Sequence, residues 1–281
     1  MELAVGIDVG FSAGRRSTGV VVLDRSTKAV VKGSQPQVCT GKDAVALVCT
    51  EMVGLNPTAV VVVVDGPFAG AEPPAKVRRI ERFFGSGPFA STPPNGAARL
   101  RLMPAPTKSG SPFLASTRNI VDALRAAGHQ ELTLTSAGLT GTVIEIFPTI
   151  FMASLLPPHA YMGERDDHTD DLWEKLIGSS PLHGTSQMCN PLGRYDSLIA
   201  DIENASWGDR HDLRAAAISA IAADWFASLP PSTGKSTAAT YIAHATEGGF
   251  LMPPRALCDP EFLAIIDGHR ATSSVSGLTW H

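Results

Sequence analysis

The sequence predicts an α/β protein in which a mixed β-sheet is flanked by helices. Three short apolar runs open the chain and are separated by turn residues, which is typical of an antiparallel meander. Segments with apolar residues at helical spacing then alternate with strand-like runs. The chain has 281 residues, 44% of them hydrophobic and 18% charged. It is therefore long enough to bury a substantial core, and its composition argues against disorder.

The first part of the chain supplies four strands and one helix. The three opening strands are apolar and bounded by Gly, Ser, Arg or Asp turns, and the helix ends at Asn56 and Pro57. The fourth strand is a continuous β-branched run, as expected for a strand that is buried on both faces. In chain order, the predicted strands are 3–9, 18–23, 28–32 and 59–64, and the helix is 42–54.

Two insertions interrupt the remaining elements of what we interpret as one domain over residues 1–281. Residues 66–112 are rich in Gly, Pro and Ser around a basic helix at 74–84, and a loop region of this length usually has a function. A second, helical insertion is expected at about 148–208. The other predicted elements are helices at 111–127, 148–156, 168–177 and 209–228, a strand at 140–147, and a late hairpin at 240–243 and 250–252.

This order of elements is that of the ribonuclease H-like fold, in which a five-stranded mixed sheet is flanked by helices. In that arrangement the first and fourth strands are neighbours at the centre of the sheet. Asp8 and Asp65, each near the C-terminal end of one of these strands, would then lie side by side. Open α/β sheets bind their ligands at that edge.

Four acidic residues are the strongest candidates for a functional site: Asp8, Asp65, Glu145 and Asp212. Each lies at the end of a strand-like run or at the start of a helix-like run, in apolar surroundings. Carboxylates there are costly to bury unless they are paired, protonated or neutralised by a metal ion. Taken singly, Asp8 and Asp65 also fit turns or strand exits, and Asp212 also fits a helix N-terminus.

A cluster of these carboxylates would bind Mg²⁺ or Mn²⁺, which prefer oxygen ligands. Two such ions can activate a water and stabilise the leaving oxygen of a phosphodiester. In this hypothesis Asp8 bridges the metals, Asp65 and Glu145 complete one coordination sphere, and Asp212 completes the other. His211 would orient a water or the leaving group. The predicted function is metal-dependent hydrolysis of the phosphodiester bonds of DNA or RNA.

The distribution of charge points to phosphate binding by the first insertion. The whole chain has a net charge of −4. Between Glu72 and Arg125, however, there are nine basic residues and three acidic ones, so that segment has a net charge of +6 and the remainder −10. A basic segment beside acidic catalytic residues could hold phosphates. We predict substrate contacts for Arg78, Arg79 and Arg82; a solvated helix face is the alternative.

The chain resembles the family called domain of unknown function 429, a group of predicted nucleases with a ribonuclease H-like fold. The resemblance spans most of the chain. It lies in Gly6-Ile-Asp8, Val64-Asp65-Gly-Pro67, Arg78-Arg79-Ile-Glu-Arg82, Ile144-Glu145-Ile-Phe-Pro148, Arg210-His211-Asp212 and Glu247-Gly-Gly-Phe-Leu-Met-Pro253. It implies the same fold, carboxylate site and nuclease activity.

The sequence departs from the family pattern at one position. The pattern at the last long helix is similar to His-Asp-x-x-Asp-Ala, whereas here His211 and Asp212 are followed by Ala215 and Ala216. In another register Asp209 and Asp212 would share one helix face. In the first register one metal ligand is missing.

Two other functions fit the same residues. An actin-like sugar kinase or ATPase also begins with a Gly-Ile-Asp-x-Gly strand, but its second domain and later glycine-rich adenosine loop are not evident here. A non-catalytic binding protein on the same fold is the other alternative, and Ala215 and the negative net charge favour it.

The sequence also predicts the surroundings in which the protein works. Residues 1–4 lack a basic leader, no apolar run is long enough to span a membrane, and the four cysteines have no zinc-type spacing. We therefore expect a cytoplasmic protein with reduced thiols and no membrane partner.

Overall fold

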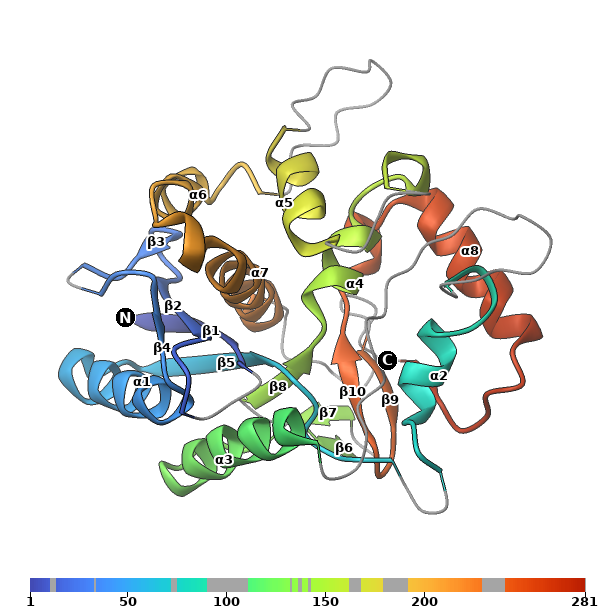
Figure 1. Cartoon of the computed structure of the whole chain (residues 1–281), viewed down its shortest axis with the longest axis horizontal. Coiled ribbons are helices and arrows are strands. Elements are labelled where there is room, and N and C mark those ends of the chain that lie inside the picture. Colours follow the sequence, from blue (N-terminus) through green and yellow to red (C-terminus); the bar gives the residue numbers. More distant parts are fainter. Residues whose placement is uncertain are drawn as a thin grey trace.

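The structure is a computed structural model, and it describes residues 1–10, 14–32, 34–71, 75–89, 111–131, 133–135, 138–140, 143–161, 168–178, 192–228 and 241–280. A mixed sheet runs through this part of the molecule, with helices on both of its faces (Figure 1). The predicted class, an α/β protein with a mixed sheet flanked by helices, is confirmed.

The main sheet has nine strands in the order β11-β9-β10-β8-β5-β1-β2-β3, and β4 pairs with β2. Strands β1, β5, β8 and β10 are parallel to one another, and the remaining strands pair antiparallel with their neighbours. The strands are β1 (Glu2–Asp8), β2 (Thr18–Asp24), β3 (Ala29–Val30), β4 (Gln37–Cys39), β5 (Ala59–Asp65), β8 (Val143–Ile146), β9 (Tyr241–His244), β10 (Gly248–Leu251) and β11 (Thr279–Trp280). A separate pair is formed by β6 (Thr133–Thr135) and β7 (Gly138–Thr140).

The first and fourth predicted strands are neighbours, as expected: β1 and β5 pair in parallel over their whole lengths. The sheet itself is larger than the five strands predicted. The late hairpin, β9 and β10, joins it through β8, and β11 adds a further strand at that edge. Because β10 covers the open side of β8, this hairpin is part of the sheet and not an appendage.

Helices cover the two faces of the sheet with different residues. Helices α1 and α3 pack against one face, while α7 crosses β1, β2 and β5 on the other (Figure 1). The helices are α1 (Gly41–Leu55), α2 (Arg79–Phe84), α3 (Pro112–Ala126), α4 (Pro148–Ser154), α5 (His168–Gly178), α6 (Asp196–Glu203), α7 (Arg210–Ala227) and α8 (Pro260–Thr272).

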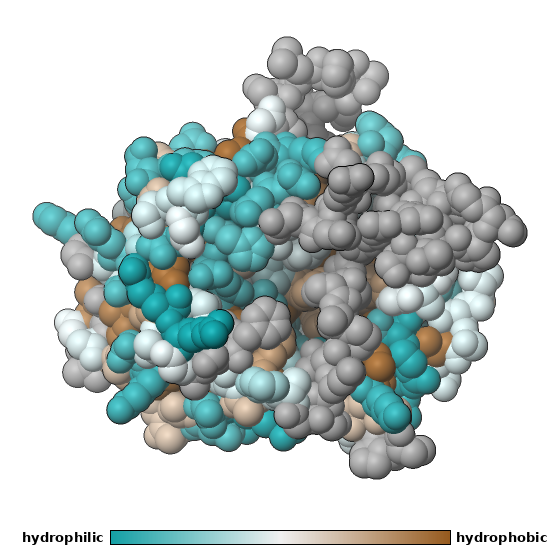
Figure 2. All heavy atoms as spheres, viewed as in Figure 1, coloured by the Kyte–Doolittle hydropathy of each residue, from teal (hydrophilic) through white to brown (hydrophobic). Residues whose placement is uncertain are grey.

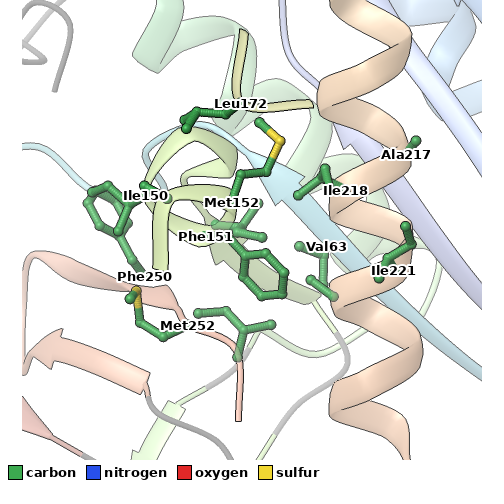
Figure 3. Close-up of a cluster of buried hydrophobic side chains, with 14 of the residues drawn as sticks. Val63, Ile150, Phe151, Met152, Leu172, Ala217, Ile218, Ile221, Phe250 and Met252 are labelled. Atoms are coloured by element: carbon green, nitrogen blue, oxygen red, sulfur yellow. The ribbon is translucent and has the colours of Figure 1, made fainter. Parts of the chain in front are cut away.

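Helix α7 lies unusually close to the sheet because small residues meet on both sides. A Cβ atom on Gly6 of β1 would come within 1.9 Å of the Ala216 carbonyl oxygen, and one on Gly19 of β2 within 2.3 Å of the Asp212 carbonyl oxygen. Its apolar side chains contact the rest of the core: Figure 3 shows Ile218 and Ile221 facing Val63 across the cluster. The alanine-rich sequence thus allows backbone atoms of α7 to contact the strands.

The described residues of the insertion at 66–112 pack against the rest of the protein. Its helix α2 begins at Arg79, not at 74 as predicted, and packs beside β9. Phe83 of α2 and Phe89 of the following 3-10 helix, Gly87–Phe89, contact α8. Lys76 and Arg82 are exposed. Its other predicted basic residues at 99, 101 and 108 lie outside the described residues.

The surface of the described residues is mainly hydrophilic, with apolar residues in scattered patches on the face shown in Figure 2. No described helix has the length and apolar character needed to cross a bilayer. Cys39, Cys49 and Cys258 are free thiols, and Cys189 lies outside the described residues.

Candidate functional site

Asp8 and Asp65 end two adjacent parallel strands and lie directly opposite each other in the register of β1 and β5. Side chains in register on neighbouring strands point to the same face, so both carboxyl groups lie on the α7 face of the sheet. The Asp8 carboxyl, when protonated, donates a hydrogen bond to the Asp65 carboxylate. Asp8 and Asp65 are each partly exposed as whole residues.

The pKa values of both groups are raised. Burial raises the pKa of Asp8 well above its usual range, and the negative charges of Asp65 and Asp212 raise it further. Burial also raises the pKa of Asp65 to about 7, although the hydrogen bond from Asp8 and the nearby His211 oppose this shift. Two carboxyl groups this close cannot both ionise readily, so at neutral pH the pair holds a proton.

The backbone around the pair is fixed by short-range contacts. The Val9 amide donates to the Asp65 carbonyl at 3.3 Å, and the Gly10 amide donates to the Thr18 hydroxyl at 3.2 Å. Gly66, at φ 151°, turns the chain away immediately after Asp65, and a side chain there would collide with Thr117 of α3. The strand ends are therefore held by hydrogen bonds to neighbouring strands and by close packing against α3.

Asp212 approaches the pair from the first turn of α7. Its backbone lies against Gly19, which is the register partner of Asp8. Burial raises the pKa of Asp212, His211 lowers it, and Asp209 and Asp170 raise it. Within the described residues, however, no three His, Cys, Asp or Glu side chains are grouped closely enough to hold a metal ion.

His211 is exposed beside Asp212 and is oriented by another acid. Its Nδ1 lies 3.2 Å from Asp170 Oδ2 on α5. Asp170 also accepts a hydrogen bond from Arg214 at 2.9 Å, and Arg214 binds Glu203 of α6 at 3.1 Å. These contacts hold the start of α7 against α5 and α6, and they orient the His211 ring.

Glu145 does not share the face of Asp8 and Asp65, which corrects the prediction that it completes their coordination sphere. Its register partner on β5 is Val64, whereas Asp65 is opposite Ile146. A shift of one residue reverses the direction of a strand side chain. Glu145 is 1% exposed and accepts a hydrogen bond from Arg78 Nη1 at 2.6 Å. The partner that a mid-strand charge requires is therefore an arginine of the insertion.

Arg78 is buried and Arg79 is partly exposed, and both are held in ion pairs with acids of the protein, which does not fit their predicted role as substrate contacts. Arg78 is 2% exposed and binds Glu81 at 2.9 Å as well as Glu145. Arg79 binds Glu247 at 3.0 Å. Of the three predicted arginines, Arg82 is the exposed one. Burial lowers the pKa of Arg78, but the carboxylates of Glu145 and Glu81 raise it by more. The Arg78 pKa is therefore raised, and the side chain stays charged.

Within the described residues, the fully buried acids differ from Asp8 and Asp65 in how their charge is neutralised. Four acids are fully buried, and each has a basic partner. Arg78 pairs with both Glu81 and Glu145, Arg79 pairs with Glu247, and Arg25 and Lys28 both pair with Asp224. No ion pair with a basic residue is formed by Asp8 or Asp65 within this part. Their neutralising partner is a proton, which a cation can replace.

Some site residues have weak sequence signals. Asp170 and Arg214 orient His211 and the start of α7, yet neither residue belongs to a recognisable sequence motif. Spacing offers one clue: His211 and Arg214 are one helical turn apart and share Asp170. Ala215, where the family pattern has a second acid, is buried and belongs to neither large apolar cluster.

Comparisons of this chain with protein-family models, with curated proteins and with solved structures found no match. The resemblance to the domain of unknown function 429 family therefore stays a prediction.

Proposed function

We propose that the edge of the sheet at Asp8 and Asp65 is the active site of a metal-dependent nuclease with a ribonuclease H-like core. The observation that carries this proposal is the hydrogen-bonded pair of carboxyl groups on adjacent parallel strands, which forms no ion pair with a basic residue among the described residues. The strand order β3-β2-β1-β5-β8 supports the proposed core.

The carboxylate oxygens of Asp8 and Asp65 are suitable ligands for a hard divalent cation such as Mg²⁺ or Mn²⁺. Mg²⁺ commonly binds to one or two carboxylates and completes its coordination with water and substrate phosphate oxygens. Two protein ligands are thus sufficient. Among the described residues, no group of three or more His, Cys, Asp or Glu side chains could hold a metal ion. Bound there, the cation would supply polarisation of a phosphodiester oxygen and activation of water.

The residues of the chain divide the remaining tasks. Asp8 and Asp65 release their shared proton when the cation binds, which makes binding tighter as pH rises. Asp212 adds negative charge from the first turn of α7. His211, exposed and oriented by Asp170, is placed to give a proton to the leaving oxygen. Glu145 is left out of this site because it is paired with Arg78.

The test is cleavage of labelled single-stranded and double-stranded DNA and RNA with Mg²⁺, with Mn²⁺ and with chelator. We expect metal-dependent products from the original protein and none from the Asp8→Asn and Asp65→Asn variants. The matched control is Asp201→Asn, which removes an exposed acid on α6 and should leave cleavage unchanged. Cleavage no higher than that of Asp8→Asn across the panel would reject the nuclease.

A non-catalytic binding protein is the second candidate, because Ala215 replaces an expected acid and no three-residue metal group occurs among the described side chains. This candidate predicts binding of nucleic acid without turnover. A gel-shift assay on the same panel distinguishes the two: binding that persists in Asp8→Asn, with no cleavage by either protein, favours it.

A further inference from the structure

Trp207 is an aromatic side chain that the packing of the protein leaves in solvent. It is 83% exposed, whereas Trp173 is fully buried and Trp225 and Trp280 pack on the core. It begins the short 3-10 helix Trp207–Asp209 that leads into α7, so it precedes His211 and Asp212 by about one helical turn. An exposed indole at this position has no role in the core.

Two arginines bind at the turn that carries this indole, and one of them lies over the ring. The Arg210 guanidinium carbon lies 5.7 Å from the centre of the Trp207 ring, and Arg210 Nε donates to the Ala205 carbonyl at 3.1 Å, which holds the cation in place. Arg16, with its side chain 65% exposed, reaches the same turn from the β1–β2 connection: its Nη2 binds Asp209 at 3.0 Å and its Nε donates to the Val38 carbonyl at 2.7 Å. Arg16 thereby neutralises Asp209, the acid of this turn, and Arg210 remains as the cation over the ring.

This surface fits a base and a phosphate better than a protein face. Only three large hydrophobic side chains of the described residues are exposed, namely Met1, Trp207 and Leu257. Stable association of two proteins requires a larger apolar area than one ring provides. A flat exposed indole beside arginines is instead suited to stack a nucleobase while the cations bind the adjoining phosphates.

The stacking requirement also selects the substrate. A base inside a duplex has both faces covered by its neighbours, so only an unpaired base can lie on Trp207. We propose that Trp207, Arg210 and Arg16 form a stacking platform for single-stranded nucleic acid beside the carboxylate site. This inference rests on the proposed function for its substrate class, but the platform can be tested without catalysis.

The experiment measures binding of a fluorescently labelled short single strand, with chelator present and in the Asp8→Asn background, so that no cleavage occurs. We expect Trp207→Ala to weaken single-strand binding about tenfold, because one stacked base is lost. Trp207→Phe should restore part of the affinity. Binding of the duplex of the same sequence should be unchanged by either substitution.

The arginine is tested with a matched pair of variants. Arg210 lies over Trp207 and Arg270 lies 5.1 Å from the centre of the Trp280 ring, so each substitution to Gln removes one cation from a tryptophan. We expect weaker binding and a smaller salt dependence for Arg210→Gln only. Equal single-strand affinity of Trp207→Ala and the original protein would overturn the platform. So would sedimentation that shows a dimer dissociated by Trp207→Ala.

Failure of this inference and failure of the nuclease give different results. If the platform exists but the nuclease does not, single strands bind through Trp207 and no protein cleaves them. If the nuclease exists without the platform, cleavage requires Asp8 while Trp207→Ala leaves both KM and binding unchanged.

Discussion

Asp8 and Asp65 share a hydrogen bond between carboxyl groups, although they are the last residues of two different strands. This relationship follows from the parallel register of β1 and β5, which places the two strand ends at the same height. It makes the pair a single titrating unit, and the pH dependence of stability and of metal binding should report on it.

The first prediction concerns stability against pH. The folded pKa of Asp65 is about 7 and that of Asp8 is raised, so the folded protein holds protons that the unfolded chain releases near its ordinary pKa of about 4. The contribution of this pair to the free energy of unfolding should therefore be complete below pH 4 and be lost as pH rises towards 7. Urea unfolding at several pH values measures this. Asp65→Asn should flatten the fall and Asp201→Asn should not; equal slopes in both variants would contradict the shared proton.

The second prediction concerns metal and protons together. A divalent cation at Asp8 and Asp65 displaces their proton, so Mn²⁺ should bind more tightly at pH 8 than at pH 6 and should release protons on binding. Isothermal titration in buffers of different ionisation enthalpy counts those protons. Unchanged proton release in Asp8→Asn would place the metal elsewhere.

The third prediction separates Glu145 from the site. Arg78→Met leaves Glu145 and Glu81 buried without their cation, which should cost about 3–5 kcal/mol of unfolding free energy. Glu145→Gln keeps a hydrogen-bond acceptor for Arg78 and should cost less. Neither change should alter Mn²⁺ affinity. A loss of Mn²⁺ binding in Glu145→Gln at unchanged thermal stability would restore Glu145 as a ligand.

The fourth prediction concerns the distance between α7 and the sheet. A Cβ at position 19 would lie 2.3 Å from the Asp212 carbonyl oxygen, so Gly19→Ala must push the start of α7 away from Asp8. We expect a loss of about 1–3 kcal/mol in stability and weaker cleavage. Gly268→Ala in α8 is the matched control, since apart from its own helix backbone no atom lies within 4 Å of the added Cβ. Cleavage that survives Gly19→Ala at full rate would remove Asp212 from the mechanism.

The fifth prediction uses the departure at Ala215. An Asp there would stand one helical turn from Asp212, and its buried position should lower the stability of the metal-free protein by about 1–3 kcal/mol. Saturating Mn²⁺ should recover part of that loss if the carboxylate reaches the site. Thermal melts with and without Mn²⁺ compare Ala215→Asp with the original protein. An equal loss in both conditions would show that position 215 does not reach the metal.

The sequence was sufficient to predict the central strands and their two aspartates. A short apolar run indicated β1, a run of β-branched residues indicated β5, and the order of elements indicated that they are neighbours. Register is different: whether Glu145 points with Asp65 or away from it depends on a shift of one residue between strands, which apolar periodicity in a fully buried strand does not reveal.

The ion pairs were beyond the reach of sequence patterns for a related reason. Arg78 and Glu145 are 67 positions apart, and a basic helix looks the same whether its arginines face solvent or a buried carboxylate. Helix α8 was also missed, although Asp259, Pro260 and Glu261 form a recognisable helix start in which Asp259 caps two amides.

The hydrogen bond between Arg16 and Asp209 closes a loop of 193 residues, and α7 covers β1, β2 and β5 from the same late part of the chain. During synthesis the apolar α7 face of these strands stays uncovered until α7 has left the ribosome. Such long-range closure slows folding, so completion of the site should coincide with the last stage of folding. A nascent chain would thus carry both aspartates while still lacking the helix that makes them a site.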